Sequence, residues 1–243
     1  MRRTIFFLIA LIISSVVAAQ SREVAHNNDL WFLQLSKFEL NDKWGLENEL
    51  HLRLANWGET KQQILLRPSI WYKVNDNVKF QFGYTHIETY PYGKQALAIR
   101  TPENNIWGQV ALDHSAGSLK VSHRYRMEER WTGRTINTTS GNPEVDGSLH
   151  RNRFRYRITL KKEFSEGKNY VAVFDEVWMN FGENTGLNRL DQNWLYSGIG
   201  RKISAQIALE LGYMWQIIEK ADGIRYESNN TIQFTAHYTL KKK

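Results

Sequence analysis

Residues 44–57 read Trp-Gly-Leu-Glu-Asn-Glu-Leu-His-Leu-Arg-Leu-Ala-Asn-Trp, and this stretch decides the fold. In an extended chain, one face of the segment carries aliphatic and aromatic side chains and the other carries charged and polar ones. The apolar face holds Trp44, Leu46, Leu50, Leu52 and Leu54, and the polar face holds Glu47, Glu49, His51 and Arg53. A period of two predicts a β-strand, because successive side chains point to opposite faces of a sheet.

Similar alternation recurs along the chain and predicts about eleven strands. The expected ranges are 30–40, 44–57, 61–74, 78–90, 105–115, 119–130, 152–164, 170–181, 192–203, 206–219 and 229–240. Most have the ten or so residues that a tilted membrane strand requires. Pro68 removes a ladder donor in mid-strand and predicts a bulge there.

The N-terminus has the three regions of a secretory signal peptide. Arg2 and Arg3 are basic, residues 4–17 are almost wholly apolar, and Val17, Ala18 and Ala19 are small. The apolar run is shorter than the roughly 20 residues of a membrane-spanning helix. We expect residues 1–19 to be a signal peptide cleaved after Ala19, and residues 20–243 to form one domain.

Together these features predict an all-β fold: an antiparallel transmembrane β-barrel in a bacterial outer membrane. The mean hydropathy of -0.53 does not oppose this, because polar inward residues cancel apolar outward ones along each strand. About eleven strands enclose a lumen that we expect to be too wide for side chains to fill, which favours the apolar face outward. Many of the aromatic residues lie towards strand ends and are expected to form girdles at the two membrane interfaces. These residues are Trp44, Trp57, Tyr72, Tyr84, Trp107, Tyr125, Trp131, Trp178, Trp194, Tyr213, Trp215 and Tyr238.

The connections between the strands alternate between short and long, as in outer-membrane barrels, where the long loops face outside. The long loops are expected at 91–104, 131–151, 182–191 and 220–228. An odd strand number is unusual for such barrels, so we expect about twelve strands, with ten as the alternative. Either one strand is missed or miscounted in the list above, or residues 20–29 thread the lumen or form a short stub.

The positive charge of the chain narrows the choice of partners. Removing Arg2 and Arg3 lowers the formal net charge from +7 to +5. Export, and the spread of basic residues over many strands, argue against nucleic acid. The expected partners are outer-membrane lipid, lipopolysaccharide and a small anionic solute.

Four segments resemble a Gram-negative family catalogued as domain of unknown function 2490. They are residues 122–131 (Ser-His-Arg-Tyr-Arg-Met-Glu-Glu-Arg-Trp), 152–157 (Asn-Arg-Phe-Arg-Tyr-Arg), 174–180 (Phe-Asp-Glu-Val-Trp-Met-Asn) and 191–193 (Asp-Gln-Asn). The resemblance extends over essentially the whole mature chain, although Trp194 stands where that family suggests a basic residue. It implies an outer-membrane barrel and brings no established activity or catalytic residues.

Charged residues on the inward faces form the densest candidate site. The expected lumen-lining residues are Glu47, Glu49, Arg53, Arg124, Arg126, Glu128, Arg130, Arg153, Arg155, Arg157 and Glu210, with Asp175 and Glu176 as further carboxylates that would balance the arginines. Two interpretations stay open. The arginines and carboxylates either form a salt-bridged plug in a structural barrel, or line a narrow channel that favours anions.

Two other classes of function stay open beside these. His86 and Glu88 share the outward face near the long-loop rim, where a lipid-modifying or lipopolysaccharide-modifying hydrolase would act, but no serine lies obviously near them. Residues 135–147 are expected to be a polar external loop that could bind a ligand. The seven histidines show no metal-ligand spacing, and no cofactor motif is present, so we expect neither a metal nor a cofactor.

Overall fold

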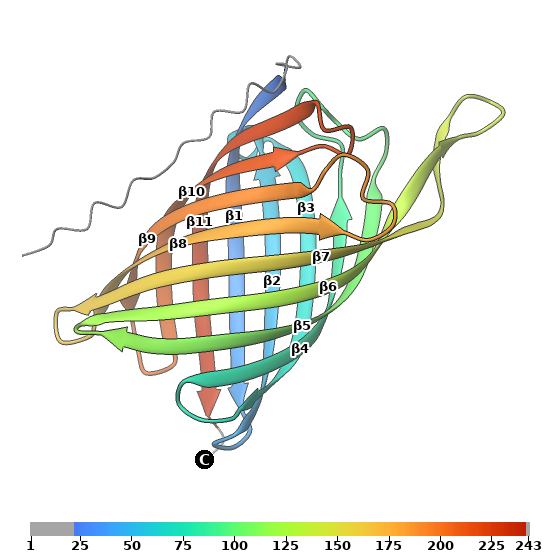
Figure 1. The fold of residues 1–243 in the computed structure, drawn as a ribbon. Coiled ribbons are helices and arrows are strands. Elements are labelled where there is room, and N and C mark those ends of the chain that lie inside the picture. The colour runs from blue at the N-terminus through green and yellow to red at the C-terminus, as the bar shows by residue number, and fades with distance from the viewer. Residues whose placement is uncertain (1–21, 242–243) are drawn as a thin grey trace, which may run out of the picture.

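The computed structural model describes residues 22–241, and these form a closed barrel of eleven strands (Figure 1). The strands are β1 (Glu23–Glu39), β2 (Trp44–Ala55), β3 (Thr60–Lys73), β4 (Val78–Thr89), β5 (Thr101–Ala116), β6 (Leu119–Asn137), β7 (Pro143–Phe164), β8 (Asn169–Phe181), β9 (Leu190–Lys202), β10 (Ile207–Glu219) and β11 (Arg225–Lys241). One turn of 3-10 helix, Asn56–Gly58, joins β2 to β3. No helix in this described part of the chain is long and apolar enough to cross a membrane.

Neighbouring strands along the chain pair antiparallel, and β1 closes the barrel by pairing parallel with β11. The parallel register runs without a break from Glu23 opposite Arg225 to Glu39 opposite Lys241. Residues 22–241 contain the eleven strands that alternation predicted, within the expected range of ten to twelve, and no twelfth strand. Residues 23–29 belong to β1, so they are neither a thread through the lumen nor a stub.

The two faces of the wall have the polarity that the sequence predicted. On β10, the outward Leu209, Leu211 and Tyr213 are exposed, whereas the inward Met214 and Gln216 are buried. The same alternation extends around the barrel, so the outer wall is predominantly apolar and the inner wall is rich in polar side chains.

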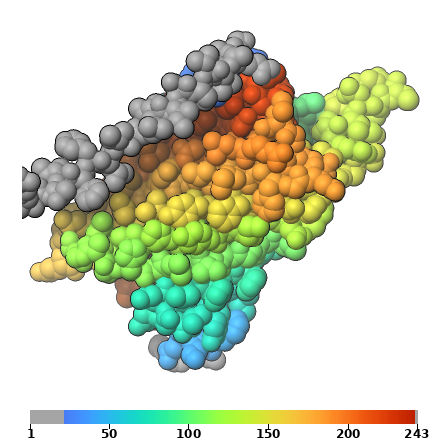
Figure 2. Space-filling model, viewed as in Figure 1, coloured from blue at the N-terminus to red at the C-terminus, as the bar shows by residue number. Residues whose placement is uncertain are grey.

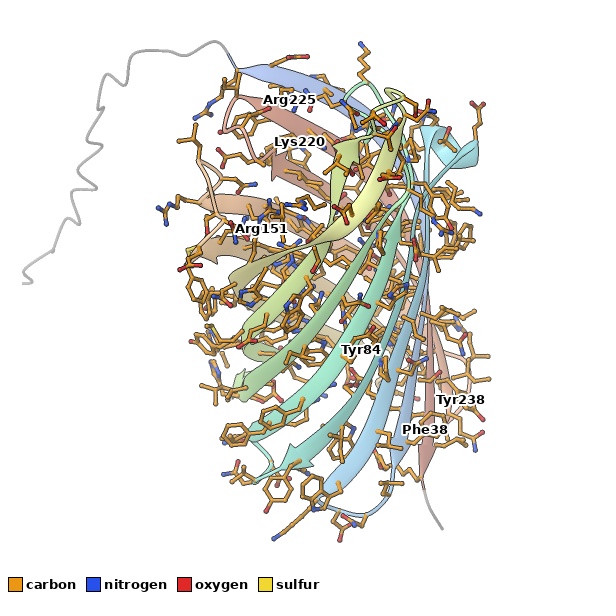
Figure 3. The ribbon with its side chains drawn as sticks, turned by 90° about the vertical axis from the view of Figure 1, so that its right-hand side faces the viewer. Phe38, Tyr84, Arg151, Lys220, Arg225 and Tyr238 are labelled. Carbon is orange, nitrogen blue, oxygen red and sulfur yellow. The ribbon has the colours of Figure 1, made fainter. Side chains whose placement is uncertain are left out.

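The two ends of the barrel differ in their connections. At the short-turn end, Asn41 Oδ1 accepts hydrogen bonds from the backbone N–H groups of Lys43 and Trp44, and Asn75 Oδ1 does the same for Asn77 and Val78. Such Asx turns replace backbone bonds that the reversing chain loses. The connections 90–100, 182–189 and 220–224 lie at the other, long-loop end, towards which Arg151, Lys220 and Arg225 lie in Figure 3, with Phe38 and Tyr238 near the short turns.

The expected loop at 131–151 is wrong, because these residues extend β6 and β7. β6 ends at Asn137 and β7 begins at Pro143. Trp131 and Thr132 still pair with β5, and beyond them residues 133–148 form a hairpin arm that stands clear of the barrel wall (Figure 2). Threonine and valine side chains and cross-strand pairs extend the ladder past a register shift between Gly133 and Thr135. Only residues 138–142 form the tip.

Glycines on the inner wall make room for large aromatic rings. A Cβ atom at Gly212 of β10 would fall inside the Tyr196 ring of β9, and one at Gly83 of β4 would fall inside the Trp107 ring of β5. Each ring therefore lies flat on the neighbouring strand. The predicted bulge at Pro68 is wrong: the pairs Leu66–His86 and Ser69–Gly83 keep one register across it.

Candidate functional site

All eleven residues expected to line the lumen lie on the inner wall. On β6, Arg126 and Glu128 are buried, whereas Met127 between them is exposed on the outer face. On β7, Arg153 and Arg155 are buried in the same way. Asp175 is the exception among the carboxylates proposed to balance the arginines. Its side chain is on the outer face of β8, where Oδ1 accepts a hydrogen bond of 2.7 Å from Asn193 Nδ2.

The inner-wall charges meet at mid-height in what we call the ion-paired layer: Arg126, Glu128, Arg153, Arg155 and Glu176. Glu128 Oε2 accepts from Arg153 Nε at 2.7 Å, and its Oε1 accepts from Arg155 Nη1 at 2.7 Å. Arg126 Nη1 lies 3.7 Å from the same Oε1. Because the two partner strands are in register at Glu128 and Arg153, these contacts follow directly from the pairing of β6 with β7.

Glu176 of β8 is shared by three guanidinium groups. Its Oε1 lies 2.5 Å from Arg124 Nη2 and 2.8 Å from Arg155 Nε, and its Oε2 lies 2.5 Å from Arg157 Nη2. Charge-assisted hydrogen bonds of this kind are roughly twice as strong as neutral ones. One carboxylate thus holds side chains from β6 and β7 against β8.

Indole rings lie against the guanidinium groups from the other side. Arg155 lies 3.5 Å from the ring centre of Trp178, and Arg126 lies 4.0 Å from that of Trp107. Arg53 lies 3.9 Å from the ring centre of Trp31. These are cation–π contacts, which strengthen when the cation is removed from water. The rings of Trp31, Trp178 and Trp194 also pack on Tyr196 and Met214 to form one buried aromatic cluster.

Two predictions about the barrel interior are therefore wrong. Trp107, Trp178 and Trp194 are buried in the lumen and do not belong to the girdles, because their positions have inward parity. The lumen is also not too wide to fill. Arginine and tryptophan side chains are long enough to reach one another across it, which short apolar side chains would not be.

The remaining expected residues lie towards the two ends of the lumen. Arg130 donates to both oxygens of Glu103, at 2.8 and 2.7 Å. Glu47 Oε2 lies 3.5 Å from Lys37 Nζ, and Glu210 accepts a hydrogen bond from Tyr196.

Several lumen charges escaped prediction, among them the buried Asp29 of β1 and Glu227 of β11. Arg67 shares the inner face of β3 with Leu65 and Trp71, and these apolar neighbours made that face look apolar in the sequence. Glu103 precedes the expected start of its strand at residue 105, and Asp191 occupies a register shift between β8 and β9. Asp191 accepts from Arg153 at 2.9 Å, which could have been anticipated from the excess of arginine.

The ion-paired layer and the aromatic cluster divide the lumen into two cavities. The long-loop cavity, of about 80 Å³, includes Gln62, Tyr92 and Glu103 in its lining. The short-turn cavity, of about 90 Å³, includes Glu49, His51 and Arg124. Trp31, Arg53, Arg67, Trp178 and Trp194 line both cavities and so form the partition between them.

His86 and Glu88 lie together on the outer face of β4, at the height expected near the long-loop rim. His86 Nε2 lies 3.0 Å from Glu88 Oε1, and its Nδ1 lies 2.9 Å from Asn104 Oδ1, which also accepts from Tyr84. A general base needs a lone pair directed at its nucleophile. Both ring nitrogens already face oxygen atoms, and no serine, threonine or cysteine of residues 22–241 hydrogen-bonds to His86.

Within the described part of the chain, no group of three or more His, Cys, Asp or Glu side chains has the arrangement of a metal site. The arrangement around the lumen is instead one of arginines, carboxylates and indoles.

The chain matches one protein family and is similar to one curated protein and to at least two solved structures. A family model described as "Protein of unknown function (DUF2490)" matches residues 28–227. An uncharacterized protein of Methylorubrum extorquens is 24% identical over 98% of this chain and 99% of its own. Among solved structures, the NanC porin aligns with a TM-score of 0.53 at 10% identity, over 88% of this chain and 99% of that one. The β domain of the Bordetella autotransporter BrkA aligns with a TM-score of 0.42 at 9% identity over 80% of each chain.

Proposed function

Since the chain belongs to the DUF2490 family, a family of proteins of unknown function, we propose that it is an outer-membrane β-barrel whose lumen is closed at rest and favours anions when it opens. In this proposal residues 1–19 direct export and are removed. The apolar outer wall then faces lipid and lipopolysaccharide. The strands support this location, because even the shortest have 12 residues, and about 9–11 residues suffice for a tilted membrane strand.

The observation that carries the closed state is the burial of charge at the centre of the lumen. Arg126, Arg155 and Glu176 are 1%, 2% and 0% exposed, respectively. A water-filled pore at this height would expose these groups. Their burial supports a barrel that holds its own lumen shut through ion pairs.

The preference for anions is argued from charge balance. The lumen holds eight arginines: Arg53, Arg67 and the six on β6 and β7. The carboxylates that contact these arginines are Glu49, Glu103, Glu128, Glu176 and Asp191. Arginine rings line pores that select anions, because fixed positive charge lowers the barrier to an anion and raises it for a cation.

The test is single-channel conductance of refolded residues 20–243 in a planar bilayer under a salt gradient. The wild-type protein should be silent or open rarely. The double variant Trp178→Ala with Trp194→Ala removes two rings of the partition, and it should conduct with a reversal potential that reports anion preference.

The matched control is Trp44→Ala with Trp215→Ala, which removes two exposed rings from the outer face. It should remain silent. A folded, inserted Trp178/Trp194 variant that passes no current, or that prefers cations, would contradict the proposal.

A second candidate function is surface binding through the hairpin arm. The arm projects beyond the rim of the barrel and is not part of its closed wall (Figure 1), so it contributes nothing to closure. Its tip carries Thr138, Ser140 and Asn142, which hydrogen-bond to one another. Replacing residues 135–147 with a two-residue turn should leave the barrel folded and abolish binding of the protein, refolded in vesicles free of lipopolysaccharide, to added lipopolysaccharide; retained binding would remove the arm from consideration.

A further inference from the structure

The short-turn cavity has two unlike walls. One wall carries the guanidinium groups of Arg53, Arg67, Arg124, Arg155 and Arg157. The other is apolar and includes Leu33, Leu35 and Met214. A cavity of about 90 Å³ has room for roughly three water molecules at about 30 Å³ each, or for one anion of four or five non-hydrogen atoms.

The charged wall is not balanced by the carboxylates near it. Glu176 contacts Arg124, Arg155 and Arg157 together, and Glu128 pairs with Arg155 at 2.7 Å but also pairs with Arg153. Glu49 is 2.5 Å from Arg67, and its second partner is His51 at 3.2 Å. Arg53 has no carboxylate partner among the described residues; its Nη1 donates to Gln63, and Asp29 towards the long-loop end is held by Gln62. Buried positive charge in excess of its partners is costly unless an anion offsets it.

Two donors on this wall lack an acceptor. Arg53 Nε and Arg124 Nε are buried without a hydrogen-bond partner in the part of the chain that the structure describes. Arg53 is 7% exposed and lines the cavity, so its unpaired N–H group is buried inside the barrel and is not hydrated by bulk solvent. A buried donor without an acceptor loses its hydrogen bonds to water and gains no other hydrogen bond in their place, which is unfavourable.

The cavity also has a water-accessible side. The side chains of Arg124 and Arg157 are 17% and 22% exposed, and they pair across β6 and β7 nearer the short turns than Arg126 and Arg155 do. A solute would therefore enter from the short-turn end, while the partition blocks its passage to the other side.

We propose that the short-turn cavity is a binding site for a short-chain monocarboxylate, of the size of acetate or propionate. The carboxylate would accept from the unpaired guanidinium donors, and the alkyl group would lie against Leu33, Leu35 and Met214. A sulfate or phosphate fits less well, because some of its oxygens would face the apolar wall. This inference rests on the proposed closed lumen and names its solute class.

The experiment is isothermal titration of refolded residues 20–243 in detergent micelles with sodium propionate, at constant chloride. The wild-type protein should bind one equivalent saturably. Arg124→Gln removes one of the two unpaired donors and should weaken binding at least about tenfold, equivalent to about 1.4 kcal/mol. Glu49→Gln removes a competing carboxylate and should bind more tightly, a change opposite in sign to simple loss of structure.

Arg134→Gln is the charge-matched control, because Arg134 lies on the arm and pairs with Asp146 at 3.4 Å, far from the cavity lining. It should bind like the wild type. The proposal is overturned by absence of saturable binding to folded wild-type protein, by equal affinity in Arg124→Gln, or by tighter binding of sulfate than of propionate. If the wild-type protein binds propionate but the Trp178/Trp194 variant passes no current, the binding site is supported and the channel proposal is contradicted. The two proposals can therefore fail separately.

Discussion

Replacing Glu176 with glutamine tests the central claim that one buried carboxylate holds three arginines in place. The substitution keeps the shape of the side chain and one acceptor oxygen, but removes the negative charge. Glu176→Gln also turns an N–H group towards guanidinium groups that have only donors to offer. Arg124, Arg155 and Arg157 would then face one another without their shared counter-ion.

The size of the effect follows from the burial of Glu176, which is 0% exposed. Removing one partner of a buried ion pair destabilises a protein by about 3–5 kcal/mol, because the other charge is left uncompensated. Here three charges are left, with Glu128 still paired to Arg155 at 2.7 Å. We therefore expect a loss of at least about 3 kcal/mol in the free energy of unfolding, out of a total on the order of 5–15 kcal/mol.

The assay is urea unfolding of the refolded protein in lipid vesicles, followed by tryptophan fluorescence, to which Trp178 on the same strand contributes. The neighbouring substitution Asp175→Asn is the control: it makes the same chemical change on the outer face of the same strand. It should leave stability unchanged or raise it, because it removes a charge from an apolar surface. A Glu176→Gln midpoint equal to that of the wild type with the same slope, or an equal loss in Asp175→Asn, would refute the reasoning.

Three further predictions follow from single features of the structure. Gly212→Ala places a methyl group against the Tyr196 ring and should lower the free energy of unfolding by about 1–3 kcal/mol, as overpacking does. Gly108→Ala, on the outer face of β5 with its Cβ 3.1 Å from the Phe82 ring, should cost less, and equal effects in urea titrations would contradict this. The backbone N–H groups of Arg225 and Ile224, with the Arg225 guanidinium, lower the pKa of Asp222 from 3.8 to about 2. The stabilisation of the 220–224 turn should thus be complete above pH 3.8 and be lost as the pH falls through about 2. The Ile224 amide donates to the Asp222 carboxylate, so its NMR resonance should report this titration, and a midpoint near pH 3.8 would contradict the prediction. The native chain has no cysteine, so Arg22→Cys and Asp222→Cys should react with a membrane-impermeant maleimide on intact cells, whereas Asp76→Cys should react only after the outer membrane is permeabilised.

The wall of the barrel could be predicted from sequence because its signal is local. Each strand shows its own period of two, and Arg126, Glu128, Arg153 and Arg155 share the parity of the inner face without reference to any other strand. The identity of the partners could not be predicted in this way. That Glu176 rather than Asp175 receives the arginines depends on the pairing of Arg157 with Glu176 across β7 and β8.

The tryptophans are a second case in which the sequence prediction and the structure differ. Trp44 and Trp215 are exposed on the outer wall, whereas Trp107 and Trp178 are buried beneath arginines. The sequence prediction assigned Trp107 and Trp178 to the membrane interfaces because aromatic residues are enriched there, although the parity of both positions points inward. The glycine that opposes Trp107, Gly83, carried the missing signal, because a ring that lies flat on the inner wall needs a neighbour without a side chain.

The odd strand number has a consequence for the placement of the two termini. In an antiparallel barrel with an even number of strands, the first and last strands run in opposite directions and both termini lie at one end. With eleven strands, β1 and β11 run in the same direction, so only a parallel pairing closes the wall. Glu23 then hydrogen-bonds to Ile224 at the long-loop end, while β11 ends at Lys241 beside the short turns. If the long loops face outside, the start of β1 lies outside and the end of β11 lies on the opposite side of the membrane. The seam between β1 and β11, at which Phe32 stacks on Phe234, is therefore the one parallel pair among the strands that the structure describes.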